Sequence, residues 1–170
     1  MSEGALAAEL GNLIHSHLPD KLHLRYEYMY SSLLPTGVGS EDVTALARAD
    51  LAVYESLKSP SGQQTSSVRF VIELKRASAA EGRINKDLRR LALIVENREN
   101  VRAFLCVASE ESRPNRFATV NGIARRKEVP VEGSTCVCAV VNLKKAAFLF
   151  ENRERAHYVC LIEVYLPTED

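Results

Sequence analysis

The sequence lacks an excess of charge of either sign, and it lacks any apolar stretch long enough to cross a bilayer. Its 22 basic and 22 acidic residues give a formal net charge of zero, so nucleic-acid binding would depend on a local basic patch. The N-terminus has no charged start followed by an apolar signal core. These absences predict a cytoplasmic protein with no membrane partner.

Motifs that mark several enzyme classes are also missing. The chain contains no GxSxG, Walker-type or dinucleotide-binding glycine pattern, which disfavours the corresponding hydrolases and nucleotide-dependent enzymes. No CxxC pair occurs, so a zinc site is disfavoured. Because the four cysteines lie in strand-like apolar runs, they are expected to be buried reduced thiols; they are Cys106, Cys136, Cys138 and Cys160.

The composition is that of one globular domain. The 170 residues are 46% hydrophobic and 26% charged, which is ordinary for a folded chain that buries its own core. We therefore expect a single domain over residues 1–170, with a core at about residues 5–109 and a C-terminal extension at about residues 110–170.

The stretch that organises the chain is the apolar, β-type run of residues 67–76. Successive side chains of a strand point to opposite faces, so Glu73 and Lys75 share one face. A second β-rich run, residues 48–54, carries Asp50, and a turn-rich segment separates the two runs. An antiparallel hairpin of these runs would bring Asp50 beside Glu73 and Lys75.

The remaining periodicity predicts a mixed α/β fold. Helical spacing covers residues 4–17 and 83–95, and a strand over residues 21–30 places Tyr26, Tyr28 and Tyr30 on one side. A buried strand at 101–108 should return parallel to the run at 67–76. Two later strands, at 134–143 and 157–166, flank an expected short helix at 144–154. The predicted class is α/β, a mixed central sheet flanked by helices with a C-terminal strand extension.

Asp50, then Glu73-Leu74-Lys75 after a hairpin, then a helix with a polar margin resemble the PD-(D/E)XK phosphodiesterase superfamily. That superfamily includes restriction-endonuclease-like and Holliday-junction-resolvase-like nucleases. The resemblance implies a restriction-endonuclease-like αβββαβ core and covers about Leu6 to Ser109. The sequence departs from the pattern at Ala49, where the family often has proline.

The resemblance implies a Mg²⁺- or Mn²⁺-dependent deoxyribonuclease. Asp50, Glu73 and the carbonyl of Leu74 would supply oxygen ligands of the kind that hard cations prefer. Lys75 would orient the attacking water, and Glu9 resembles the acid that many members carry on the first helix. The expected auxiliary residues are Glu27, Lys86 and Asp87, and the expected nucleic-acid contacts are Arg83, Arg90, Arg113 and Arg116.

Each of these roles has a plainer alternative. Glu9 can be an ordinary helix-boundary acid, Glu27 a cross-strand partner of an arginine, and Glu73 with Lys75 a strand-end ion pair. The second hypothesis is accordingly a catalytically inactive fold of this class that acts as a nucleic-acid-binding or protein-assembly module. In either case the expected partner is DNA, with RNA not excluded, and a homodimer or a partner protein could supply targeting.

Overall fold

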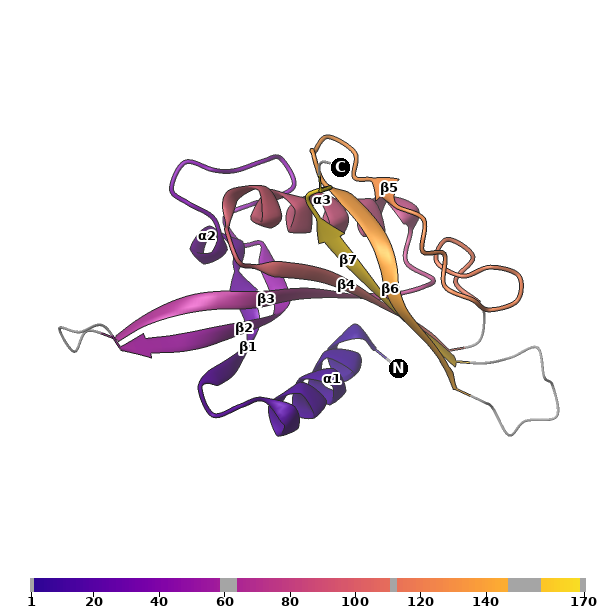
Figure 1. Ribbon diagram of the computed structural model, residues 1–170, viewed down its shortest axis with the longest axis horizontal. Helices are drawn as coiled ribbons and strands as arrows, with labels where there is room; N and C mark the ends of the chain where they lie inside the picture. The colour runs from indigo at the N-terminus through magenta and orange to yellow at the C-terminus, as the bar shows by residue number, and fades with distance from the viewer. Residues whose placement is uncertain (1, 59–63, 111–112, 147–156, 169–170) are drawn as a thin grey trace.

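The computed structural model describes residues 2–58, 64–110, 113–146 and 157–168. Within these ranges the strands form one seven-stranded sheet in the order β1-β2-β3-β4-β7-β6-β5. Figure 1 shows helix α1 on one face of the sheet and α3 on the other. The elements are α1 (Glu3–His17), β1 (Leu22–Met29), α2 (Tyr30–Leu33), β2 (Arg48–Lys58), β3 (Gln64–Arg76), α3 (Glu81–Asn97), β4 (Arg102–Ser109), β5 (Val129–Pro130), β6 (Val137–Ala146) and β7 (His157–Tyr165).

The central strands are connected as the sequence predicts. β2 and β3 form an antiparallel hairpin in which Leu51 lies opposite Ile72. α3 then crosses over the sheet, and β4 pairs parallel to β3, with Glu73 opposite Leu105. The α/β class with a mixed sheet flanked by helices is therefore confirmed, and the C-terminal strands extend the sheet beyond β4.

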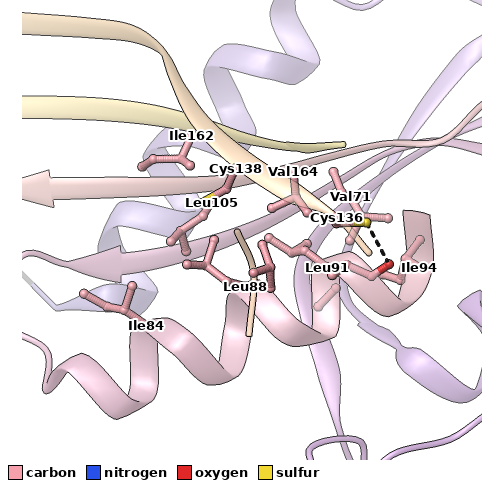
Figure 2. Close-up of a cluster of buried hydrophobic side chains, with 14 of the residues drawn as sticks. Val71, Ile84, Leu88, Leu91, Ile94, Leu105, Cys136, Cys138, Ile162 and Val164 are labelled. Carbon is pink, nitrogen blue, oxygen red and sulfur yellow. Dashed lines mark hydrogen bonds between the residues drawn. The ribbon is translucent and has the colours of Figure 1, made fainter. Parts of the chain in front are cut away.

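Helix α3 covers the larger core. Its apolar residues recur at helical spacing and pack against the sheet, where Val71, Leu105 and Val164 are buried. Figure 2 shows this contact, together with the 3.8 Å hydrogen bond from Cys136 Sγ to the Ala92 carbonyl. The helix residues that line the contact are Ile84, Leu88, Leu91 and Ile94.

Helix α1 covers a smaller cluster on the opposite face. Leu51, Leu74 and Cys106 are buried there, beneath a stripe of α1 residues that includes Ala7, Leu10 and Ile14. Because successive β3 residues alternate between faces, Leu74 points toward α1 whereas Glu73 and Lys75 point toward α3. The prediction that Glu73 and Lys75 share one face is confirmed, and that face also carries the buried Val71.

Gly11 lets α1 approach β1 closely. A Cβ atom at this position would lie 2.0 Å from the hydroxyl and 2.5 Å from the Cζ of Tyr26. We expect Gly11→Ala to lower the free energy of unfolding by about 1–3 kcal/mol, because the tyrosine or the helix must move. Urea unfolding measures the change. Gly82→Ala is the matched control, since no atom lies within 4 Å of a Cβ there. Equal stabilities for the two variants would contradict this packing.

Strand β1 changes face at Glu27, which differs from the predicted alternation. Leu24 packs on the α1 side and Tyr26 contacts α1, but Tyr28 packs against the α3 core. Glu27 has φ of 50°, a left-handed conformation that interrupts the two-residue repeat. Tyr30 is not a strand residue and instead begins α2. The prediction of three tyrosines on one side was therefore wrong.

Strand β6 is displaced by three residues toward the C-terminus from its expected range, and β7 ends one residue early. β6 continues through Ala146, so the helix predicted at 144–154 is wrong at its first three residues, and its other residues lie outside the described ranges. The predicted buried thiols are confirmed, because all four cysteines are free and buried. Burial raises the pKa of Cys106 and that of Cys160 to about 11. None of the described helices is long and apolar enough to cross a membrane.

Candidate active site

Asp50 lies where the ladder between β2 and β3 ends. The last paired residues are Leu51 and Ile72, and one step further Asp50 and Glu73 would face each other. Here the Asp50 side chain replaces the backbone pairing between the strands, because its Oδ2 accepts a 2.6 Å hydrogen bond from the Leu74 amide. The carboxylate is thereby held against the backbone that joins Glu73 to Lys75.

Glu73 is a buried acid with a specific partner. Its side chain is 2% exposed, and its Oε1 accepts a 2.5 Å hydrogen bond from the Tyr30 hydroxyl. Burial, together with the nearby carboxylates of Asp87 and Asp50, holds the pKa of Glu73 well above its ordinary value. A bound cation would reverse this effect, since it favours the ionised form.

Lys75 reaches across to helix α3. Its Nζ lies 3.0 Å from Asp87 Oδ2 and donates a 3.0 Å hydrogen bond to the Leu74 carbonyl. Burial alone lowers the pKa of Lys75, but Asp87, Asp50 and Glu3 raise it, and the net shift is upward. In this arrangement Lys75 is an ammonium group at neutral pH, so it can donate hydrogen bonds and cannot accept a proton.

Asp87 is the most confined acid on α3. It is 3% exposed, and Arg90 Nη1 lies 3.4 Å from its Oδ1. Burial raises the pKa of Asp87, and the opposing effects of Lys75 and Arg90 do not fully offset it. The Lys75 ammonium faces Oδ2 outside hydrogen-bond geometry, and this oxygen has no hydrogen bond within the described part of the chain.

The cluster contains more acids, two buried and one partly buried, than cations that face them. When ionised, Asp50, Glu73 and Asp87 carry three negative charges against the two positive charges of Lys75 and Arg90. The raised pKa values of Glu73 and Asp87 reflect this excess together with their burial. An excess of buried negative charge is stabilised either by proton uptake or by a cation.

Helix α1 brings Glu3, and not Glu9, to this cluster. Glu3 Oε2 lies 3.9 Å from Lys75 Nζ, and its Oε1 accepts a 3.5 Å hydrogen bond from the Arg76 amide. Glu9 is exposed. Glu3 continues the stripe of Ala7 and Leu10 at helical spacing, whereas Glu9 falls between the residues of that stripe. The expectation that Glu9 reaches the site is corrected accordingly.

The other predicted auxiliary residues occupy different places. Glu27 is exposed, across from Asp50 in the β1–β2 register, where its positive φ interrupts the strand. Lys86 is partly buried on α3 and lowers the pKa of Asp42 through its charge. Asp87 is the one of the three that contacts Lys75 directly.

Of the arginines predicted to contact nucleic acid, some are exposed and others bind groups within the fold. Arg83 is exposed on the first turns of α3. Arg90 donates a 2.6 Å hydrogen bond to the Asp42 carbonyl and lies over the Tyr30 ring, 5.7 Å from its centre. Arg90 therefore supports the cluster from inside the fold, which differs from the expected phosphate contact.

The two arginines expected after β4 lie in a separate loop. Arg113 donates hydrogen bonds to Asn115 Oδ1 and to the Val120 carbonyl, at 2.6 to 3.0 Å, so it stabilises the loop itself. Arg116 is exposed and lies 3.8 Å from Glu81. The structure gives Arg113 a structural role, whereas Arg116 is accessible.

The donor set fits a hard cation. Asp50 and Glu73 offer carboxylate oxygens, and the Leu74 carbonyl directly follows Glu73 in the chain and accepts a hydrogen bond from Lys75. The nearby Asp87 Oδ2 is held by the Lys75 ammonium at 3.0 Å. In the described ranges no three His, Cys, Asp or Glu side chains converge on a metal position. A cation here would accordingly take two carboxylates, the carbonyl and waters.

Sequence reasoning missed two residues of the cluster, Tyr30 and Glu3. Tyr30 carries no sequence signal, because its contact with Glu73 spans 43 residues and depends on α2. Glu3 had a detectable signal, since it lies four residues before Ala7 on the apolar stripe of α1.

Comparison of the chain with protein-family models, with curated proteins and with solved structures gives no match. The residues of the cluster and their geometry therefore indicate the function.

Proposed function

We propose that the chain is a metal-dependent nuclease of the PD-(D/E)XK type that hydrolyses phosphodiester bonds in DNA. The observation that carries this proposal is the convergence of Asp50, Glu73 and Lys75 at the point where β2 and β3 part. Acid clusters with strongly shifted pKa values are common at functional sites. Here Glu73 is both the most buried acid and the one whose pKa is raised well above its ordinary value.

Asp50, Glu73 and the Leu74 carbonyl would hold the cation, which we expect to be Mg²⁺ or Mn²⁺. When bound, such an ion lowers the pKa of a coordinated water and offsets charge on phosphoryl oxygens. The site suits an ion of this kind because its three acids, when ionised, carry more negative charge than Lys75 and Arg90 offset. The hydrogen bond donated by the Leu74 amide holds the Asp50 carboxylate in position.

Lys75 would act directly on the reacting groups. Its raised pKa keeps it protonated, so it can donate hydrogen bonds to the attacking water and to a developing phosphoryl charge. Asp87 would act as a positioning residue, because its contact at 3.0 Å restrains the Lys75 ammonium. Glu3 adds a more distant restraint from the start of α1.

The order of elements supports a restriction-endonuclease-like core. Helix α1, strands β1 to β3, helix α3 and strand β4 follow the αβββαβ order, with the short α2 inserted after β1. We propose that this unit is the catalytic core and that β5 to β7 extend its sheet. Exposed Arg83 and Arg116 would contact phosphates, which fix position without reading sequence. A homodimer or a partner protein would supply a second site or targeting.

The alternative is a binding or assembly module without catalysis. Two contacts favour it, because Tyr30 already satisfies one Glu73 oxygen and Asp87 already pairs with Lys75. Under this alternative the acids serve as structural partners of those two residues, and DNA is bound without being cut.

The test compares wild type with Asp50→Asn on plasmid and branched DNA, in Mg²⁺, Mn²⁺ and EDTA. We expect cutting by wild type in either metal, no cutting in EDTA, and a loss of about 10²-fold or more in the variant. Asp20→Asn, a change at an exposed turn acid, is the charge-matched control. Binding without cutting by all three proteins would favour the module instead.

A further inference from the structure

A hollow lies away from the acid cluster, between the loop that follows β4 and the strands β6 and β7. Its volume is about 650 Å³, within the range of small-molecule sites. The floor is apolar and belongs to the same core cluster that α3 covers. The floor residues are Phe117, Cys138, Val140 and Ile162.

The rim of the hollow is cationic. Arg116, Arg125, Arg126 and Lys127 all line it, and no carboxylate of a described residue does. Arg125 is oriented by hydrogen bonds from its Nε to the carbonyls of Asn115 and Ala118. Arg126 and Lys127 have no ion pair or side-chain hydrogen bond to any described residue and are exposed.

We propose that this hollow binds a nucleoside monophosphate, with the base over the apolar floor and the phosphate at the cationic rim. Four cations around one opening match a doubly charged phosphate better than a single carboxylate. Arginine forks bind phosphate oxygens in pairs. The apolar floor matches the low polarity of a base face, and a volume of about 650 Å³ accommodates a nucleotide.

The hollow shares Arg116 with the proposed DNA contacts, but it is separate from the proposed metal-binding and reacting groups. Asp50, Glu73 and Lys75 do not line the hollow. Nucleotide binding should therefore need no divalent metal, and it should survive Asp50→Asn. A failure of DNA cutting and a failure of nucleotide binding are thus separate results.

The test is calorimetric titration of the full chain with AMP in EDTA. We expect saturable binding of AMP. Adenosine and inorganic phosphate should bind at least about tenfold more weakly, because adenosine lacks the phosphate and inorganic phosphate lacks the base. Octanoate tests for an apolar anion site. Absence of AMP binding, or tighter binding of octanoate, would overturn the proposal.

Variants locate the site. Arg126→Gln combined with Lys127→Gln should weaken AMP binding about tenfold or more, and Lys144→Gln, an exposed change on β6 outside the hollow, should leave it unchanged. Ala124→Phe should abolish binding by filling the space, with thermal unfolding as the check on folding. Unchanged AMP affinity in both hollow variants would overturn the assignment.

The same titration distinguishes two sources of the ligand. A 5′-phosphorylated oligothymidylate that competes with AMP, where its 5′-hydroxyl counterpart does not, identifies the end of a nucleic-acid strand. AMP binding without such competition identifies a free nucleotide.

Discussion

Lys75→Ala is expected to abolish metal-dependent cutting and to destabilise the fold in the same step. The cutting rate should fall by about 10²–10³-fold, because the Lys75 ammonium that donates to the reacting groups is lost. The free energy of unfolding should fall by about 3–5 kcal/mol, since Asp87 would be left buried with its 3.0 Å partner removed. Single-turnover cutting rates and urea unfolding measure the two effects.

A second substitution separates the two losses. In Lys75→Ala with Asp87→Asn, the buried charge is gone, so most of the stability should return while cutting stays lost. Asp87→Asn alone completes the cycle and gives the coupling energy of the pair. Arg76→Ala is the neighbouring control, because that surface ion pair with Glu110 should contribute less than about 1 kcal/mol. Recovery of cutting in the double variant would contradict a direct role for Lys75.

The juxtaposition of Asp50, Glu73 and Lys75 could be predicted because it depends on local rules. The two-residue repeat of a strand places Glu73 and Lys75 on one face, and a hairpin places Asp50 beside them. The structure confirms the hairpin and the shared face. These features need no knowledge of distant packing.

Side chains that reach the cluster from other elements could not be assigned reliably. Glu3 continues the apolar stripe of α1 and Glu9 does not, but which end of that stripe meets the cluster is set by the packing of the helix on Leu51 and Leu74. Arg90 looked exposed because the neighbours that engage it, Asp42 and Tyr30, are more than 40 residues away.

Local irregularity caused the remaining errors. Glu27 follows the strand alternation in sequence, but its φ of 50° turns the chain and moves Tyr28 to the other face. A non-glycine residue with positive φ has no reliable sequence signature. This change of face occurs just before α2, and it therefore helps to bring the Tyr30 hydroxyl within hydrogen-bond distance of Glu73.

Glu73→Gln is expected to stabilise the metal-free protein while abolishing metal-dependent cutting. Glutamine keeps the shape of the side chain and can still accept the hydrogen bond from Tyr30. It removes the buried negative charge that Asp87 and Asp50 oppose. It also removes a proposed metal ligand, so added Mg²⁺ should raise the unfolding temperature of wild type and not that of the variant.

The raised pKa of Glu73 determines how the stability difference between variant and wild type changes with pH. Below the ordinary pKa of 4.5, Glu73 is protonated in both states and the carboxyl carries no ionisation penalty. As pH rises, the unfolded chain loses the proton first, so wild type loses stability until pH passes the raised pKa of the folded state. Across this pH range the free energy of unfolding of Glu73→Gln should increasingly exceed that of wild type. The difference should reach about 1.4 kcal/mol for each unit that separates the folded and unfolded pKa values of Glu73. Urea unfolding in EDTA at a series of pH values measures it.

Glu55→Gln supplies a control of opposite sign on the neighbouring strand. Hydrogen bonds from Arg69 and Lys21 lower the pKa of Glu55 in the folded state. Its ionised form therefore stabilises the fold above its ordinary pKa, and that stability is lost as pH falls through the lowered value. Glu55→Gln should be less stable than wild type at neutral pH, with a difference that shrinks in acid. If Glu73→Gln and Glu55→Gln show the same pH trend, ionisation of Glu73 does not destabilise the fold. The excess of negative charge that favours a cation is then absent.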